Sequence, residues 1–302
     1  MKYIELKTNL PKDLAGEYTA FLDLLQVEGY YEVLFDSSLP RPKDGAIIRD
    51  DTMINVYLGE ADKEKEIKIH IFLKTKADNN YFLESRLVET REFEEAYKEF
   101  YKPFKIGDRF CVIPIWEKDS EEAKNVKGPG VLNLFMNPGL AFGTGHHETT
   151  KLMLSRMGNI ISEGNSVLDM GTGSGILSIG AGLLGAKKII AIDIDPNAVR
   201  ATEFNWQENS CSKTTQISIL EGGFDTQDIF DFEYDIVLAN ITYAIISQNI
   251  KNIYKIKANK FLFSGIITER KEDSINLFNE VLGGRQIYNE SLDGWEIIEW
   301  ER

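Results

Sequence analysis

A glycine-rich turn directly follows a short apolar run near the middle of the chain. Residues 167–175 read VLDMGTGSG, so three alternating glycines leave a stretch of backbone without Cβ atoms. A second apolar run, residues 188–193, ends in Asp193, 22 positions after Gly171. That is about the spacing at which the next strand offers an acid to ribose hydroxyls. The two runs therefore predict one site for a ligand that contains a ribose or a phosphate.

The glycine spacing distinguishes two kinds of nucleotide site. Dinucleotide sites use Gly-x-Gly-x-x-Gly, in which the third glycine lets the helix pack closely and the pyrophosphate lies on the helix N-terminus. This chain instead has an acid and three glycines at alternate positions, Asp169, Gly171, Gly173 and Gly175. That spacing is typical of S-adenosylmethionine-dependent methyltransferases, where an acid beneath the turn can meet the ligand's amino group. The alternative is that the glycines serve only a tight turn from strand to helix.

A second polar segment, NPGLAFGTGHHETT at residues 137–150, reads as a loop that leads into a helix. Two of the chain's three histidines, His146 and His147, stand directly before the helix start, where backbone N–H groups favour an anionic group such as a methionine carboxylate. Thr150 can contact such a ligand or, like Thr149, only cap the helix. His147 can equally be a surface residue without a role. No metal site is predicted, because adjacent loop histidines point apart and no further His or Cys is near.

An amide follows another apolar run, since residues 235–243 read DIVLANITY. Asn240 at a strand's carboxyl end would lie in the crevice where open α/β sheets bind ligands. Its side chain could accept from a substrate N–H and orient the nitrogen lone pair toward a methyl donor. The alternative is an Asn that only forms the turn after the strand.

Composition narrows the class of protein. The chain has 302 residues, 43% of them hydrophobic, and a formal net charge of -14. Long-lived non-specific binding to nucleic acid needs a surplus of Lys and Arg, so the charge argues against it and allows a basic protein as partner. Many proteins are acidic for solubility alone. Cys111 and Cys211 lie far apart, and no apolar run reaches the roughly 18 residues of a membrane span. We expect a cytoplasmic monomer that does not contact a membrane.

The second half of the chain alternates strands and helices. We expect strands at 166–170, 189–193, 216–221, 234–241 and 261–265, with helices at 176–184, from Pro196, at 243–256 and at 269–282. Residues 285–290 and 295–300 flank a turn signal and predict an antiparallel hairpin at the sheet edge. The pattern is that of a seven-stranded, mostly parallel, Rossmann-like methyltransferase sheet covered by helices on both faces.

The first half has a different pattern. We expect strands at 3–7, 30–35, 53–58 and 66–73 around an amphipathic helix at 11–26, which together form a small α+β domain. A helix at 91–101, an extended run at 110–116 and a mobile loop at 117–130 follow. The predicted domains are 1–90 for substrate recognition, 91–130 as linker helix, strand and loop, and 131–302 for methyl transfer.

Taken together, segments 137–150, 169–175, 192–196 and 239–241 resemble the ribosomal protein L11 methyltransferase family of the PrmA type. The run GLAFGTGH at 139–146, followed by Thr149 and Thr150, is the specific part, because all related methyltransferases share the glycine turn. The resemblance is clear from about 137 to 265 and thinner before that.

The resemblance implies S-adenosylmethionine as cofactor and lysine amines of a basic ribosomal protein as acceptors; the acceptor's N-terminal amine is left open. It matches Thr150, Gly171, Asp193 and Asn240 to donor-binding positions, and it gives substrate binding to the N-terminal domain. To these we add Gly173 and Asp169 as donor-binding candidates, and Asn240 and His146 as the catalytic candidates.

Two departures from the family pattern bear on the acceptor. Phe93 and Tyr97 stand where the family's linker helix usually carries tryptophans. Thr242 and Tyr243 replace a Leu-Ala-like pair after Asn240, which leaves the acceptor's identity open. Two alternatives remain: a methyltransferase for a glutamine amide or a nucleobase amine, and a donor-binding interaction protein without catalysis.

Overall fold

The computed structural model describes residues 2–11, 14–25, 27–33, 51–77, 81–89, 101–137, 145–209, 211 and 215–302. The chain divides into two compact units, Met1–Phe100 and Tyr101–Arg302. Each unit has its own buried core, and each is described here by itself.

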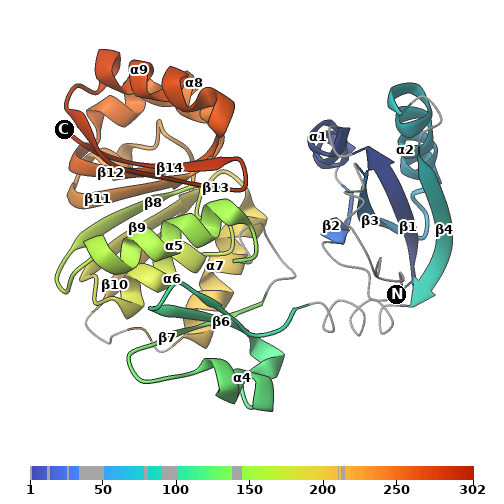
Figure 1. The fold of residues 1–302 in the computed structure, drawn as a ribbon, viewed down its shortest axis with the longest axis horizontal. Coiled ribbons are helices and arrows are strands. Elements are labelled where there is room, and N and C mark those ends of the chain that lie inside the picture. The colour runs from blue at the N-terminus through green and yellow to red at the C-terminus, as the bar shows by residue number, and fades with distance from the viewer. Residues whose placement is uncertain are drawn as a thin grey trace, which may run out of the picture. The chain divides into compact units, whose positions relative to one another are not determined.

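The first unit is an antiparallel sheet with two helices on one face (Figure 1). Its strand order is β2-β3-β1-β4, from β1 (Lys2–Pro11), β2 (Gly29–Val33), β3 (Asp51–Gly59) and β4 (Phe82–Glu89). Alternate residues of β1 face helices α1 (Ala15–Leu25) and α2 (Lys63–Lys76). The core between sheet and helices includes Leu6, Leu10, Tyr18, Leu22, Val56 and Ile69.

Helix α2 corrects the strand predicted at 66–73. The alternation of apolar and polar residues in EIKIHIFL suggested a strand, but the segment is helical throughout. Ile69 and Leu73 lie one helical turn apart and are both buried, whereas Ile67 and Ile71 are 58% and 57% exposed on the helix. The alternation therefore reflects two apolar faces of one helix. Strand β4 was not predicted, and the expected helix at 91–101 lies outside the described residues except for Tyr101.

The second unit is built on a seven-stranded sheet of order β10-β9-β8-β11-β12-β14-β13 (Figure 1). The parallel strands are β8 (Ser166–Met170), β9 (Lys188–Asp193), β10 (Gln216–Glu221), β11 (Glu233–Asn240) and β12 (Lys257–Ile267). β14 (Trp295–Glu301) pairs antiparallel with β12 and with the edge strand β13 (Arg285–Leu292). Asp293 and Gly294 take φ values of 46° and 84° in the connecting turn. The predicted α/β sheet with a C-terminal antiparallel hairpin is confirmed.

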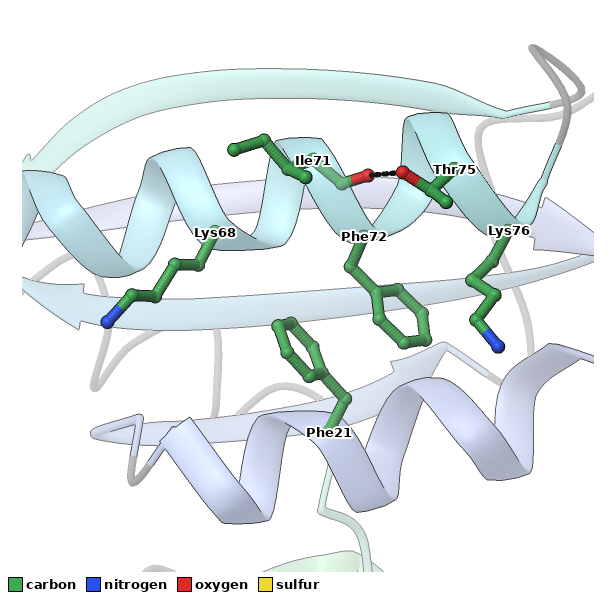
Figure 2. Close-up of a pocket in the computed structure, with 6 residues that line it drawn as sticks. All are labelled: Phe21, Lys68, Ile71, Phe72, Thr75 and Lys76. Carbon is green, nitrogen blue, oxygen red and sulfur yellow. Dashed lines mark hydrogen bonds between the residues drawn. The ribbon is translucent and has the colours of Figure 1, made fainter.

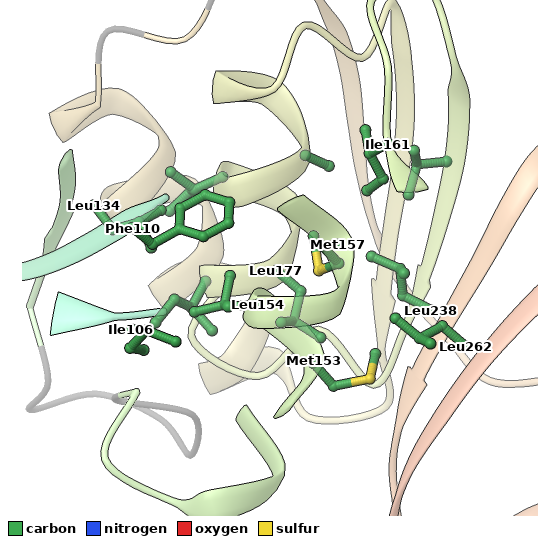
Figure 3. Packing of buried hydrophobic residues seen from close by; sticks show 14 of the residues in the cluster. Ile106, Phe110, Leu134, Met153, Leu154, Met157, Ile161, Leu177, Leu238 and Leu262 are labelled. Atoms are coloured by element: carbon green, nitrogen blue, oxygen red, sulfur yellow. The ribbon is translucent and has the colours of Figure 1, made fainter. Parts of the chain in front are cut away.

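Helices cover both faces of this sheet. α5 (Glu148–Ile160) and α6 (Ile176–Leu183) pack on one face against residues such as Val167, Leu238 and Leu262, as Figure 3 shows for Met153, Leu154, Met157 and Leu177. α8 (Tyr243–Lys255) and α9 (Lys271–Val281) pack on the other face, where Leu168, Val237 and Phe263 are buried. Neighbouring residues of each strand thus enter opposite cores, and for this reason the strands read as continuous apolar runs.

A small three-stranded sheet extends the first of these cores. It consists of β5 (Phe104–Ile106), β6 (Phe110–Pro114) and β7 (Leu132–Met136), and it brings Ile106, Phe110 and Leu134 into the core of α5 and α6 (Figure 3). The segment from 101 onward therefore packs within the second unit. The loop expected at 117–130 contains helix α4 (Glu121–Val126), because Ser120 caps it by accepting from the Ala123 N–H at 3.0 Å and Ala123 is buried.

Candidate functional site

The predicted site residues meet at the carboxyl ends of β8, β9 and β11, the edge of a parallel sheet where ligands bind. The glycine turn follows β8, Asp193 ends β9, and Asn240 ends β11. Thr150 lies in the first turn of α5 and contacts Asn240. Segments distant in sequence thus form one site.

The glycine turn has a backbone that only glycine adopts readily. Gly171, Gly173 and Gly175 have φ values of 71°, 57° and 82°, in the left-handed region. The N–H groups of Gly171 and Thr172 both donate to the carbonyl of Ile192 in β9, at 2.9 and 3.1 Å. Two neighbouring strands therefore hold the turn in place.

Asp193 is joined directly to the turn. Its Oδ2 accepts from the Gly173 N–H at 2.9 Å, and its Oδ1 accepts from the Asp195 N–H at 3.0 Å. A carboxylate has about four acceptor positions, so each oxygen keeps a lone pair for a further donor. The side chain is half-buried and can reach a ligand on the turn.

Asp169 lies fully buried beneath the same turn. Its Oδ2 accepts from the hydroxyls of Thr172 at 2.8 Å and of Ser178 at 2.7 Å, which ties the turn to α6. Its Oδ1 is buried and has no partner among the described residues. Burial, helped by the charge of Asp193 and opposed by the two hydroxyl hydrogen bonds, raises the pKa of this carboxyl to about 6.

Asn240 has an oriented amide. Its Nδ2 donates to Thr150 Oγ1 at 3.4 Å, which leaves Oδ1 to accept from a substrate. Thr150 is fully buried in the first turn of α5 and does not cap the helix. The cap is His147, whose Nδ1 accepts from the Thr149 N–H at 3.3 Å while its ring lies 4.8 Å from that of Trp295. His147 therefore has a structural role. Of the two alternatives for Thr150, ligand contact and helix capping, the prediction of helix capping is wrong.

His146 lies among aromatic rings. Its ring centroid is 4.2 Å from that of Phe104 and 5.1 Å from that of Tyr101. Burial, together with the charge of Lys151, lowers the pKa of this imidazole to about 4. The ring is therefore neutral at pH 7, and its buried Nδ1 has no partner among the described residues. The predicted loop residues 138–144 lie outside the described part of the chain.

Sequence reasoning missed a contact that fixes the residue after Asn240. Ile241 lies between two glycines: a Cβ on Gly171 would be 2.7 Å from Ile241 Cγ2, and a Cβ on Gly265 would be 2.5 Å from the Ile241 carbonyl oxygen. Gly265 has a φ of 80°, and the Ile241 N–H donates to the Ser264 carbonyl at 3.1 Å. A glycine at a predicted strand end was the only sequence signal for it.

Comparison with known proteins identifies the family. The family model for ribosomal protein L11 methyltransferase (PrmA) matches residues 5–301. The chain belongs to the PrmA family. The resemblance found at residues 137–265 thus extends over nearly the whole sequence.

Relatives and a solved structure agree with this membership. A PrmA-family protein named ribosomal protein L11 methyltransferase, from Leptospira interrogans serovar copenhageni, is 51% identical over 302 residues, which cover 100% of this chain and 99% of the relative. One of the same name from Staphylococcus carnosus is 33% identical, covering 82% of this chain and 79% of the relative. The crystal structure of a ribosomal protein L11 methylase from Lactobacillus delbrueckii subsp. bulgaricus has a TM-score of 0.58 at 25% identity, covering 67% of this chain and 99% of that one.

The site geometry of this PrmA-family chain suits a nucleoside ligand with a positive charge. The left-handed backbone of the turn carries no Cβ atoms, an acid with free lone pairs stands at Asp193, and a second acid, Asp169, has an oxygen without a partner among the described residues. Within the described ranges, no cluster of three or more His, Cys, Asp or Glu side chains could hold a metal ion. No helix among those residues is long and apolar enough to span a membrane.

Proposed function

We propose that this protein transfers methyl groups from S-adenosylmethionine to lysine amines of ribosomal protein L11, with the acceptor's N-terminal amine as a further target. The observation that carries the proposal is the Asn240 amide, which Thr150 orients beside a glycine turn joined to Asp193. The family is named for methyl transfer to this acceptor. The net charge of -14 supports a basic protein as acceptor and a reaction without nucleic acid.

Four groups would hold the donor. Asp193 would accept from the ribose hydroxyls, and the backbone of Gly171 and Gly173 would lie against the nucleoside. Asp169 Oδ1 would accept from the amino group, and the first turn of α5 around Thr150 would favour the carboxylate of the methionine part. When bound, S-adenosylmethionine supplies a methyl group on a positively charged sulfur, which makes that methyl electrophilic.

The acceptor amine must be neutral to use its lone pair. A free lysine has a pKa near 10.4, so deprotonation at pH 7 costs roughly 4 to 5 kcal/mol. Burial of the amine beside a cationic ligand lowers that cost, because both effects disfavour the charged form. Asn240 Oδ1 would accept one N–H of the neutral amine and direct its lone pair. Orientation, rather than a dedicated base, would therefore supply the catalysis.

In this account His146 is an uncharged residue that lines the site. Its pKa of about 4 makes it a weak base at pH 7, and its contacts with Phe104 and Tyr101 fix the ring. It would shape the pocket around the amine and exclude water, and the proton of the amine would leave to solvent.

We assign acceptor binding to the first unit. Figure 2 shows a pocket beside α2, where Phe72 faces Phe21 of α1. The pocket has a volume of about 300 Å³, the two ring centroids are 4.4 Å apart, and the exposed Ile71 also lines it. Lys68 and Lys76 at its rim form ion pairs with Glu64 and Glu17, so the charges at the rim are balanced around an apolar floor. An exposed apolar pocket of this kind is a feature of protein-binding surfaces. Because the proposed acceptor is a ribosomal protein, we place the reaction in the cytoplasm. We propose that the protein acts as a monomer.

The test is to incubate the protein with methyl-labelled donor and a mixture of ribosomal proteins and RNA, and then to identify the labelled species by mass. Label on L11 lysines is the expected result. Label on RNA alone, on a glutamine amide, or on no species despite donor binding would overturn the proposal.

A further inference from the structure

Helix α7 (Pro196–Glu208) and its cap carry a row of buried polar side chains that face the site. Thr202 and Asn205 are fully buried, and Asn209 is 8% exposed, at positions i, i+3 and i+7. Buried amides and hydroxyls are costly unless they form hydrogen bonds. All three side chains do so, and their partners are backbone groups of other segments.

Asn205 joins two parts of the site with one amide. Its Nδ2 donates to the carbonyl of Ser174, in the glycine turn, at 2.9 Å. Its Oδ1 accepts from the N–H of Asn137 at 2.8 Å. Asn137 directly follows β7 and begins the segment that leads to His146 and Thr150. Both hydrogen-bonding ends of the amide are therefore used, each on a different half of the site.

Thr202 and Asn209 each bind only one of the two segments that Asn205 joins. Thr202 Oγ1 donates to the Gly173 carbonyl at 3.1 Å, and a Cβ on Gly175 would be 2.9 Å from Thr202 Cγ2. Asn209 binds the backbone of Phe135 with Oδ1 at 2.8 Å and Nδ2 at 2.7 Å, and its Nδ2 also donates to the Asn205 carbonyl at 2.7 Å, so outside its own helix it holds β7 and not the turn. The three residues thus provide a built-in comparison.

The far end of the same segment also rests beside the glycine turn. A Cβ on Gly145 would lie 3.2 Å from Ile176 Cδ1, and Ile176 is the first residue of α6 after Gly175. Asn137 and Gly145 are therefore both held close to the turn, Asn137 by the Asn205 amide and Gly145 by packing on Ile176.

We propose that Asn205 is a positioning residue that couples the donor-binding glycine turn to the end of β7 at Asn137. Because one amide holds both the Ser174 carbonyl and the Asn137 N–H, it fixes the position from which the turn presents the donor to Asn240. The inference rests on the proposed function, because it assigns donor binding to the turn. It predicts that loss of the amide impairs donor binding and the chemical step together.

The test compares Asn205→Ala with Thr202→Val and Asn209→Ala in the full-length protein. Donor affinity is measured by calorimetry, kcat with L11 at saturating donor, and stability by thermal unfolding. Asn205→Ala is expected to raise the donor Kd about tenfold and to lower kcat about tenfold, Thr202→Val to change only the Kd, and Asn209→Ala to lower only the unfolding midpoint. If kcat and Kd follow the midpoint across all three variants, Asn205 is merely structural and the proposal is wrong.

A conservative variant covers the case in which Asn205→Ala does not fold. Asn205→Asp keeps the acceptor for the Asn137 N–H and loses the donor to the Ser174 carbonyl. It is expected to bind the donor at least tenfold more weakly, and wild-type values for both Kd and kcat would overturn the coupling. Donor binding by the wild type distinguishes failure of the proposed function from failure of this inference. No binding refutes the proposed function, whereas equal binding by wild type and variants refutes only the role of Asn205.

Discussion

The two units hold their functional surfaces by different means. In the second unit the site is defined by backbone: the turn of three left-handed glycines is held by hydrogen bonds to the Ile192 carbonyl and to Asp193, and Ile241 by its N–H to the Ser264 carbonyl. In the first unit the pocket is defined by exposed side chains such as Ile71 and by surface ion pairs. Backbone geometry tolerates few replacements, whereas a side-chain surface can be altered without disturbing the fold. Changes in the second unit should therefore affect donor binding and turnover, and changes in the first only acceptor binding.

The largest expected effect is at Gly265. In Gly265→Ala the new Cβ would lie 2.5 Å from the Ile241 carbonyl oxygen, so the Asn240 loop must move. A shift of this kind costs about 100-fold in turnover. Gly294→Ala is the matched control, because Gly294 has a similar φ of 84° and nothing within 4 Å of its Cβ position. Equal turnover by the two variants would remove the distinction between the backbone-defined site and an ordinary turn.

The next effect concerns stability. Because the pKa of Asp169 is raised from 3.8 to about 6 in the folded state, the fold binds this proton more tightly than the unfolded chain. The stability of the wild type should fall as pH rises from about 4 to 6 and stay lower above that. Asp169→Asn removes this cost, by up to about 3 kcal/mol at pH 7, while weakening donor binding. Chemical unfolding at pH 4 and 7.5 measures the difference, and a less stable variant at pH 7.5 contradicts the account.

A smaller effect is expected at Asp193, the acid proposed to bind the ribose. Asp193→Ala should raise the donor Kd about 10- to 100-fold, the range for a lost hydrogen bond to a charged group. Asp195→Ala serves as control, because Asp195 caps α7 by accepting from the Asn197 N–H at 2.8 Å. Its loss should cost about 1 kcal/mol of stability and leave the donor Kd unchanged. Calorimetric titration of the donor into both variants decides between them.

A substitution in the first unit should weaken acceptor binding alone. Ile71→Glu places a charge beside the apolar pocket and should raise the KM for L11 about tenfold, with kcat and donor Kd unchanged. Ile287→Glu, at an exposed position of β13, is the control in the other unit. An altered kcat for Ile71→Glu, or an equal rise in KM for Ile287→Glu, would break the proposed division between the units.

The smallest effect is an expected absence of change. With the pKa of His146 at about 4, no step in kcat near pH 6.5 should arise from this residue. Turnover should instead rise with pH as more of the acceptor amine is neutral. A pH profile of kcat at saturating donor tests this, and a step near 6.5 that disappears in His146→Gln would show that the imidazole titrates in the reaction.

The same difference between the units explains how far sequence reasoning reached. The strand at 166–170 and the start of the helix at Pro196 were predicted correctly, because buried parallel strands are continuous apolar runs and Pro at a first turn marks a helix start. Residues 66–73, which lie in the helix at 63–76, were predicted as a strand, because the exposed Ile67 and Ile71 imitate alternation. Exposed apolar residues that form a binding surface blur the pattern on which prediction depends.

Within the candidate site, residues of local motifs were predictable and residues that bind other segments were not. The glycine turn and Asp193 come from strand-to-helix geometry, and the structure brings them together. Asn205 was missed because a polar residue on an amphipathic helix reads as solvent-facing. Its signal was the small and polar stripe at residues 198, 201, 202, 205 and 209, which has the spacing of a core face.

The central claim is that the Asn240 site transfers methyl groups from S-adenosylmethionine to L11. The most direct measurement is the mass of purified L11 after incubation with donor and either wild-type protein or Asn240→Ala, with the donor Kd of both determined in parallel. The account predicts added methyl groups on L11 lysines with the wild type, at least about 100-fold slower methylation with the variant, and donor Kd values within about twofold. Unmodified L11 with the wild type, or equal methylation rates for the two proteins, would contradict it.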